Sequence, residues 1–553
     1  MLFFCNLSVY KSAVSVDFPP DLCYNLFISC DFYHISFIRR YENERKENAV
    51  PASLCADAGV LRGILLRKHC SGNRCSFRKY PAVGETSADA GETEAETLEE
   101  TKLEPNLPDV TFDGYSFRML GKGESMVHWQ SKDLTADEIT GEPINDAVYN
   151  RNSLIGERYD VKFVEIDVAD YFAQQNEVNL SCQAGTDEYD MVALKPEGVV
   201  SSFIANGYLM DLHDIPHMDL TQPWYDQNSI KQMSVGGGLF CVMGSMLTMD
   251  DDATAAVFFN KKLADANGLP NLYEMVDAGT WTIDRLTEYA DLAKRDTNGD
   301  GKMTAMEDTW GALSEYSTTF ALNSGSGLTM ITKDEADIPV NTAVDEAYIA
   351  MYEKVLKIQN NWDMTMYAEA QSGFTDVWTE CMDATFQSDR ALFNICWLNR
   401  ASLFREMETD FGIIPMPKYD EAQEDYASFV HMYCANTIAV LKTGQNFERT
   451  GVILEALSAE SMYGLTEAYY EKTLKSKASR DEESSAMLDV IFGTRIYDLG
   501  YMFNWGSIYS SVGSMAGVNG QDISGYSSTM KKANKAINKA IKDAVKEMGV
   551  SEE

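Results

Sequence analysis

The sequence has no apolar run of about 18 residues, so no helix is expected to span a lipid bilayer. It is also poor in basic residues, with 46 Lys and Arg against 85 Asp and Glu and a formal net charge of −39 at pH 7. A chain this acidic repels phosphate backbones, which excludes nucleic-acid binding, and its charge equally disfavours docking on an anionic membrane.

Several enzyme signatures are missing as well. None of the six histidines belongs to an H-E-x-x-H zinc motif, and no G-x-S-x-G, P-loop or G-x-G-x-x-G motif follows an expected strand. A catalytic pair of carboxylates remains open, because 85 acidic residues supply such pairs by chance. The sequence therefore favours a protein that is not an enzyme.

The composition divides the chain near residue 80. Residues 1–80 hold 11 Lys and Arg, 7 Asp and Glu (net +4) and six of the 11 cysteines, which leaves a net charge of −43 for the remainder. Six cysteines could form a disulfide-stapled module. The segment nevertheless lacks any steady hydrophobic period, which favours an N-terminal stretch that is not a folded module.

Residues 81–110 are rich in Thr, Glu, Ala and Gly and contain no aromatic side chain. Such a segment cannot bury a core, and we expect an acidic disordered tether.

Beyond the tether, 45% apolar residues over a 553-residue chain provide material for more than one domain. Alternating and continuous apolar runs predict strands over 115–120, 160–166, 188–194, 238–243, 255–260, 390–397, 410–417 and 435–440. Amphipathic patterns predict helices over 144–155, 199–204, 283–294 and 343–360, and a last helix with lysines on its wet face. This order predicts an α/β protein with mostly parallel sheets covered by helices on both faces.

One segment, residues 296–307, fits a twelve-residue calcium loop. The six candidate ligands at positions 1, 3, 5, 7, 9 and 12 are Asp296, Asn298, Asp300, Lys302 (through its carbonyl), Thr304 and Glu307. Gly301 stands at position 6, where the chain must turn sharply. An Asp- and Asn-rich turn without metal is the alternative. No long helix is expected after the loop, so a structural Ca²⁺ clamp is predicted rather than a sensor.

Six stretches together resemble the family 1 extracellular solute-binding proteins of ABC importers, the maltose-binding-like group. In chain order they are Asn179–Val192, Phe203–Leu212, Val257–Leu269, Thr280–Asp284, Arg390–Asn394 and Phe411–Pro417. Each motif alone is weak, whereas their order and spacing over residues 112–550 are specific.

The resemblance implies a two-lobed periplasmic-binding-protein-like (type II) fold with a ligand cleft between the lobes. Lobe 1 is expected over 111–250 and 415–470, and lobe 2 over 251–414 and 471–553. It also implies a monomer that captures a small polar solute, most plainly a carbohydrate, by hinge closure and delivers it to an ABC permease. The location would be extracellular, either tethered to the cell surface as a lipoprotein or periplasmic, although residues 1–80 show no recognisable secretion signal.

Sugars present apolar ring faces and polar rims, which aromatic and carboxylate side chains suit. The candidate ligand-binding residues are Trp129, Trp224, Tyr225, Asp251, Asp252, Trp397 and Trp505. Core packing is an open alternative for Trp224, Trp397 and Trp505, as is a solvated turn for residues 250–252. A secreted carbohydrate-active enzyme and a calcium-stabilised surface adhesin remain the competing functions.

Overall fold

The computed structural model describes residues 102–123, 129–471, 474, 482–517, 520 and 523–549. All of them lie in the second of two units into which the chain divides, residues 101–553. The expectations for residues 1–80 and for most of the acidic tether fall outside the described residues. Within this part of the chain, no helix is both long and apolar enough to cross a membrane.

The first sheet has the strand order β12-β3-β1-β2. Its strands are β1 (Tyr115–Leu120), β2 (Val161–Ile166), β3 (Met191–Leu194) and β12 (Thr437–Ala439). β1 runs parallel to β2 and to β3, and β12 joins the edge antiparallel to β3. The two crossovers are α2 (Pro143–Tyr159) and α3 (Tyr171–Ala184), whose first turns are capped by Glu142 and Asp170.

The second sheet has the order β10-β4-β9-β5-β8. Its strands are β4 (Ala255–Asn260), β5 (Trp310–Ser314), β8 (Thr365–Tyr367), β9 (Ala391–Trp397) and β10 (Phe411–Ile414). β5 is parallel to β8 and β9, whereas β4 is antiparallel to β9 and β10. Both sheets are therefore mixed. The first is mostly parallel, as expected, whereas the second has as many antiparallel as parallel pairings.

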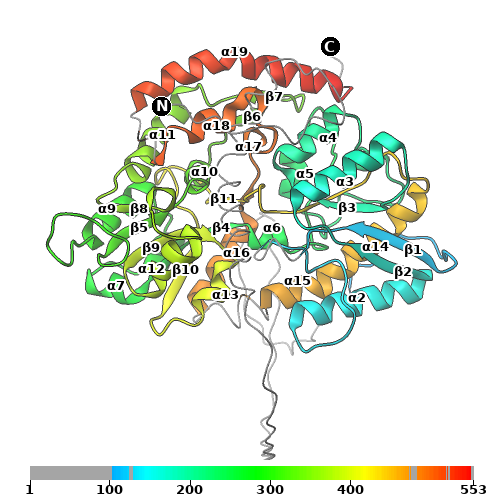
Figure 1. Cartoon of the computed structure of the whole chain (residues 1–553), viewed down its shortest axis with the longest axis horizontal. Helices are drawn as coiled ribbons and strands as arrows, with labels where there is room; N and C mark the ends of the chain where they lie inside the picture. The colour runs from blue at the N-terminus through cyan, green and yellow to red at the C-terminus, as the bar shows by residue number, and fades with distance from the viewer. Residues whose placement is uncertain are drawn as a thin grey trace, which may run out of the picture. The chain divides into compact units, whose positions relative to one another are not determined.

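Helices pack around both sheets (Figure 1). Those next to the second sheet in sequence are α7 (Lys261–Ala266), α8 (Leu272–Asp277), α9 (Ile283–Ala293), α10 (Thr318–Gly325), α11 (Glu346–Gln359), α12 (Ala384–Gln387) and α13 (Arg400–Phe404). α9 begins at the predicted cap, where the Thr282 side chain accepts the Arg285 amide.

Short elements connect the sheets. The chain leaves the first sheet through α6 (Met249–Asp252) and returns near β11 (Ser428–Phe429), which pairs in parallel with β13 (Arg495–Ile496). The later helices are α14 (Phe447–Tyr463), α15 (Leu465–Glu467), α16 (Glu482–Gly493), α17 (Leu499–Phe503), α18 (Ile508–Gly513) and α19 (Ile523–Glu547). Of these, α14 packs on α2, and α16 packs on β10.

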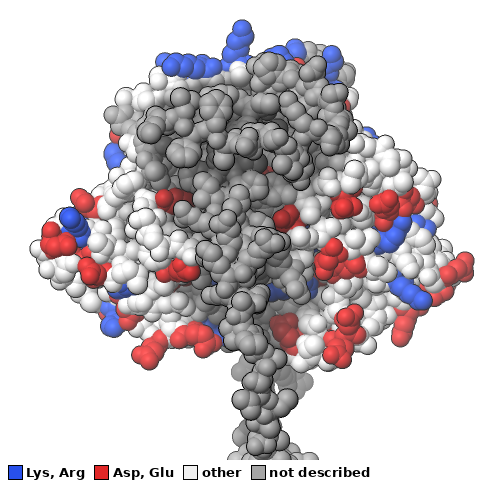
Figure 2. Space-filling model, in the orientation of Figure 1, with Lys and Arg blue, Asp and Glu red and all other residues white. Residues whose placement is uncertain are grey.

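The C-terminal helix α19 has the predicted amphipathic pattern. Ile537, Ile541 and Val545 are buried, while the lysines of the opposite face are exposed. Figure 2 shows these basic side chains along the edge that α19 occupies, whereas acidic side chains are spread over the rest of the visible face.

The structure departs from the expected elements in three places. The strand predicted over 238–243 forms only isolated bridges, such as Val242 with Ile438, because the preceding glycines turn the chain. β5 and β8 were not predicted.

Residues 102–112, most of which were expected to belong to the tether, already contact the globular unit: Lys102 pairs with Glu460, and Phe112 packs on the core. The lobe boundaries remain a prediction.

Candidate functional site

Charged and aromatic side chains follow the carboxyl ends of parallel strands in both sheets. Lys195 directly follows β3 in the first sheet. In the second sheet, Glu315 follows β5, Glu369 lies two residues beyond β8, and Trp397 ends β9. In open α/β sheets this is the edge at which ligands bind.

A chain of rings connects the two sheet edges. The Trp397 ring centroid lies 4.5 Å from that of His431, in an edge-to-face arrangement. His431 in turn contacts Tyr433 at 6.0 Å, and Tyr433 contacts Tyr171 of α3 at 5.3 Å. Aromatic contacts therefore run without a break from the end of β9 to the first helical turn after β2, which belongs to the first sheet.

Lys195 is the cation at the Tyr433–Tyr171 end of this ring chain. Its Nζ lies 4.3 Å from the Tyr171 ring centroid and 3.9 Å from that of Tyr433, within cation–π range. It also forms an ion pair of 2.9 Å with Glu197, and only 5% of the residue is exposed. Tyr171 and Tyr433 are also hydrogen-bonded to each other. We call this connected set of side chains the ring cluster; its members are Lys195, Tyr171, Tyr433, His431 and Trp397.

Burial shifts the pKa values of two nitrogen groups, one in the ring cluster and one near it. Burial lowers the pKa of His431 to about 3, so its imidazole is neutral at physiological pH. Burial also lowers the pKa of Lys122, which follows β1, to about 8, although the nearby Cys434 thiol opposes the shift. The Lys122 Nζ donates a long hydrogen bond of 3.5 Å to the Cys434 carbonyl.

The acidic side of the site consists of Glu315 and Glu369. The Tyr316 amide donates to Glu369 Oε1 over 3.1 Å, and the Glu315 amide donates to the Thr318 hydroxyl over 3.2 Å. Burial, followed by the charge of Glu369, raises the pKa of Glu315 to about 8, and burial also raises the pKa of Glu369. Among the described residues, Glu315 Oε1 and Glu369 Oε2 receive no N–H or O–H from another group.

A second aromatic group extends the site from Glu315. Tyr316 contacts Phe320 and Tyr509 at 5.8 and 5.7 Å, and Tyr509 contacts Tyr501 at 4.6 Å. Tyr501 also lies edge-on to His431 at 5.7 Å. The acidic pair and the ring cluster are therefore parts of one continuous assembly that draws on both sheets.

Of the predicted ligand-binding aromatics, the structure places Trp397 in the ring cluster. Trp129 is half-buried against the core, and its neighbours 124–128, including His128, lie outside the described residues. Trp224 and Tyr225 are buried, and the Tyr225 hydroxyl donates to Glu455 over 2.6 Å. Trp505 stacks on Phe503 with ring centroids 4.3 Å apart. The role of these last three residues as ligand contacts stays a prediction.

The predicted Asp251 and Asp252 lie where the chain crosses between the sheets. Arg495 of β13 donates to Asp251 over 2.7 Å and to Asp250 over 3.1 Å, and it also pairs with Asp226. Asp252 accepts the Tyr469 hydroxyl over 2.8 Å. Burial raises the pKa of Asp251 to about 6 in spite of the guanidinium. These carboxylates join the connecting segments to one another.

The predicted calcium loop is an exposed turn after α9. The Asp296 carboxylate accepts the amides of Gly299 and Gly301, each over 2.7 Å. The Asn298 side-chain amide donates to Glu307 over 2.8 Å, which closes the two ends of the loop. The described residues contain no group of three or more His, Cys, Asp or Glu side chains arranged to hold a metal ion. Calcium binding therefore stays a prediction.

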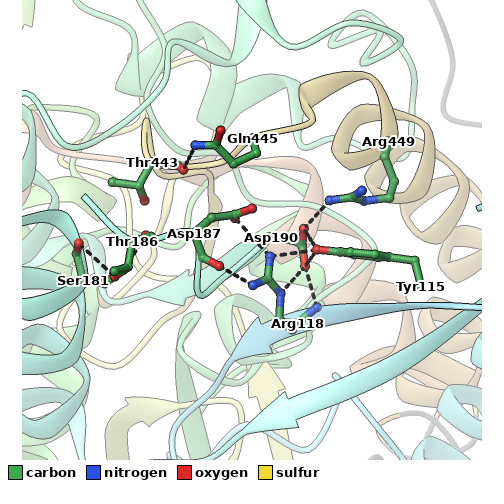
Figure 3. A network of polar contacts seen from close by, with 9 residues as sticks. All are labelled: Tyr115, Arg118, Ser181, Thr186, Asp187, Asp190, Thr443, Gln445 and Arg449. Carbon is green, nitrogen blue, oxygen red and sulfur yellow. Dashed lines mark hydrogen bonds and ion pairs between the residues drawn. The ribbon is translucent and has the colours of Figure 1, made fainter. Parts of the chain in front are cut away.

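A separate polar network surrounds Asp190, at the start of β3 (Figure 3). Its carboxylate accepts from Arg118 Nε over 2.9 Å, from the Tyr115 hydroxyl over 2.9 Å and from Arg449 over 3.2 Å. The Arg449 guanidinium also lies over the Tyr115 ring. The network fastens β1, β3 and α14 together, so Asp190, part of a motif used for the family resemblance, has a structural role here.

Sequence reasoning missed most of the assembled site. Lys195 and Glu197 could have been found, because they directly follow a predicted strand. Glu315 and Glu369 could not, since β5 and β8 were not recognised. His431 and Tyr433 follow a two-residue strand that carries no periodic signal.

No protein-family model and no curated protein matches this chain. Among solved structures, UgpB from Mycobacterium tuberculosis in complex with glycerophosphocholine covers 78% of this chain and 98% of its own, with a TM-score of 0.50 and 16% identity. UspC from M. tuberculosis covers 77% and 100%, with a TM-score of 0.49 and 15% identity. An ABC substrate-binding protein from Listeria monocytogenes in complex with cycloalternan covers 79% and 100%, with a TM-score of 0.47 and 12% identity.

At such identities the likeness shows the fold alone. The chain has the two-lobed α/β fold of periplasmic-binding proteins, as the sequence predicts, with two mixed sheets. The fold is the one used by ABC substrate-binding proteins, whereas the solutes named for the solved structures remain properties of those proteins.

Proposed function

We propose that this protein is the extracellular solute-binding component of an ABC importer and that it captures a small polar solute, most plainly a carbohydrate, by hinge closure. One observation carries the proposal: groups from the carboxyl ends of strands in both sheets meet in one assembly. A ligand that contacts Lys195 on one side and Trp397 or Glu315 on the other gains affinity only when the two lobes close, which couples binding to closure.

The chemistry of the assembly suits a carbohydrate. Trp397, Tyr433 and Tyr316 offer apolar ring faces, while Lys195 and Glu315 offer a hydrogen-bond donor and acceptor.

The remaining parts of the proposal rest on the fold and the sequence. An ABC permease would be the membrane partner, the working form would be a monomer, and the loop at 296–307 would bind a structural Ca²⁺. A tether to the cell surface, with or without a lipid anchor, would hold the protein near its permease.

The test is a thermal-shift screen of the full chain against monosaccharides and oligosaccharides, followed by calorimetry of the hits and product analysis. We expect saturable one-to-one binding without turnover. Turnover of a bound sugar would instead support the enzyme, and binding confined to polymers or surface glycans would support the adhesin.

A further inference from the structure

Glu315 and Glu369 form a pair of neighbouring carboxyls at the ends of adjacent parallel strands. The register pairs Ser314 of β5 with Tyr367 of β8, which brings the residues just beyond them to the same edge. The Glu369 carboxylate accepts the amide of Tyr316, the residue that follows Glu315, over 3.1 Å, and only 7% of Glu315 is exposed. The pair is therefore a fixed feature of the site rather than two surface acids.

No described cation neutralises this pair. Neither carboxylate forms an ion pair with a described Lys, Arg or His residue, and Glu315 Oε1 and Glu369 Oε2 accept no hydrogen bond from another group there. The three cations that face the same region near Cys434 are engaged elsewhere: Lys195 with Glu197, Arg400 with Asp383, and Lys122 at the Cys434 carbonyl.

The other groups that face the pair are neutral or acidic. The phenols of Tyr316, Tyr367 and Tyr501 and the thiols of Cys396 and Cys434 all lie within the electrostatic influence of Glu315. Glu197, which acts on Tyr316 as well, adds a further negative charge to the surroundings.

Two adjacent buried carboxyls cannot both ionise unless a positive charge joins them. Without a ligand, the pKa of Glu315, raised to about 8, keeps a proton on the pair at neutral pH. A ligand cation would displace the proton and leave two carboxylates around one positive centre.

We propose that the solute carries a positively charged nitrogen and that Glu315 and Glu369 receive this group, releasing a proton to solvent. The inference rests on the proposed solute-binding function and narrows its ligand to cationic solutes, such as amino sugars or quaternary ammonium compounds. Lys195 and the ring cluster would contact the uncharged remainder of the ligand.

The experiment compares cations with neutral compounds of the same shape, using the full chain. The probes are glucosamine against glucose, and choline against 3,3-dimethylbutan-1-ol. Calorimetry in two buffers of different ionisation enthalpy gives both the affinity and the number of protons released. We expect at least one cation to bind about tenfold or more tightly than its neutral counterpart, with release of about one proton and with tighter binding as pH rises.

Two variants test whether Glu315 and Glu369 cause the preference for the cation and the proton release. Glu369→Gln and Glu315→Gln should each abolish the preference for the cation and the proton release, whereas Glu288→Gln, on the exposed face of α9, should change neither. Circular dichroism at the assay temperature confirms that each variant is folded, and if one glutamine variant fails to fold the other decides.

The outcomes separate this inference from the proposed function. If each neutral compound binds as tightly as its cationic counterpart, the inference is overturned and the proposed function is left standing. Cation preference that persists in the folded glutamine variants also overturns it. If none of the four probes and no other small sugar binds, both the inference and the proposed function fail.

Discussion

A buried ionisable side chain reports its surroundings through its pKa, and Glu315 gives the clearest case. Its pKa is raised to about 8 from an ordinary value of 4.5, so the folded protein keeps a proton that the unfolded chain has lost. Folding stability therefore declines as pH rises between these values. The lowered pKa of His431 has the opposite effect on folding stability. Stability is lost as pH falls below 6.5, because the unfolded chain then binds a proton that the folded protein does not.

The pH dependence that Glu315 imposes on folding stability gives the first prediction. It concerns the ligand-free protein between about pH 6.5 and pH 8, where His431 no longer titrates. Over that window the melting temperature of Glu315→Gln should fall less than that of the wild type, because glutamine cannot ionise. Differential scanning calorimetry at several pH values measures both slopes. Glu288→Gln should retain the wild-type slope, and identical slopes in all three proteins would contradict the raised pKa.

Trp397 is the predicted ligand-binding residue that the structure places in the ring cluster, where its ring centroid lies 4.5 Å from that of His431 and 6.2 Å from that of Phe429. Trp397→Ala should weaken solute binding by about 1–3 kcal/mol if the ring stacks on the ligand. Calorimetric titration of the folded variant with the solute identified by screening measures this. Trp281→Phe is the matched control, because Trp281 is buried and donates to the Pro415 carbonyl, so it should cost stability but not affinity. Unchanged affinity in Trp397→Ala would assign Trp397 to the core.

Residue roles were the hardest feature to predict from the sequence. A tryptophan has the same local signature whether it lines a site or fills a core. The burial of Trp224 became visible only once α14, whose Glu455 accepts the hydroxyl of the neighbouring Tyr225, was placed. Likewise, three consecutive aspartates resemble a solvated turn until Arg495, more than 240 residues later, is seen to pair with the first two and Tyr469 with the third.

At the scale of single elements, the crossing between the sheets depends on Arg495. This one guanidinium is shared by Asp226, Asp250 and Asp251, so its loss would leave buried carboxylates uncompensated. Arg495→Met should destabilise the protein by about 3–5 kcal/mol at neutral pH. The loss should shrink in acid, where the carboxylates become protonated.

Urea denaturation of Arg495→Met at neutral and acidic pH tests this expectation. Arg285→Met is the control, since Arg285 pairs with Glu288 on an exposed helix face, where an ion pair contributes little. Equal stability of Arg495→Met and the wild type at neutral pH would show that the crossing does not depend on the guanidinium.

The loop at 296–307 carries the prediction on metal removal. Bound Ca²⁺ would stabilise the folded state by about 2.7 kcal/mol at a hundredfold excess over Kd, because the unfolded chain hardly binds it. Melting temperature should therefore fall by several degrees on chelation in the wild type and not in Glu307→Gln. A wild type that melts alike with Ca²⁺ and with chelator would identify the loop as a metal-free turn.

Elements with strong periodicity were predictable, and those without it were not. β1 and β4 occupy the expected residues, since their apolar runs are flanked by clear turn residues, and α9 begins at its predicted cap. β8 has only three residues and β11 only two, too short for any period to appear. The segment 238–243 has the apolar composition of a strand, but it finds only isolated partners.

At the scale of the whole described unit, the fold class followed from the alternation of strands and helices, whereas the mixed pairing did not. The antiparallel partners β12 and β10 come from segments that return after long excursions, and local sequence does not encode which edge they join. The assembled site depends on those same returns, because His431 and Tyr433 precede β12. The fold class could therefore be predicted from the sequence, whereas the residues that form the site could be identified only from the structure.

The final prediction concerns motion between the two sheets and their helices. Lys195 and the groups around Trp397 and Glu315 belong to different sheets, so a ligand that contacts both sets stabilises the closed arrangement by its contacts across the two lobes. Small-angle scattering of the full chain should show a smaller radius of gyration with saturating solute than without it. The Trp397→Ala variant, tested at the same saturation, should close less completely because it has lost one of the contacts that favour closure. A radius that does not change with a ligand whose binding calorimetry has verified would show that capture proceeds in a preformed site, and the hinge mechanism would then be abandoned.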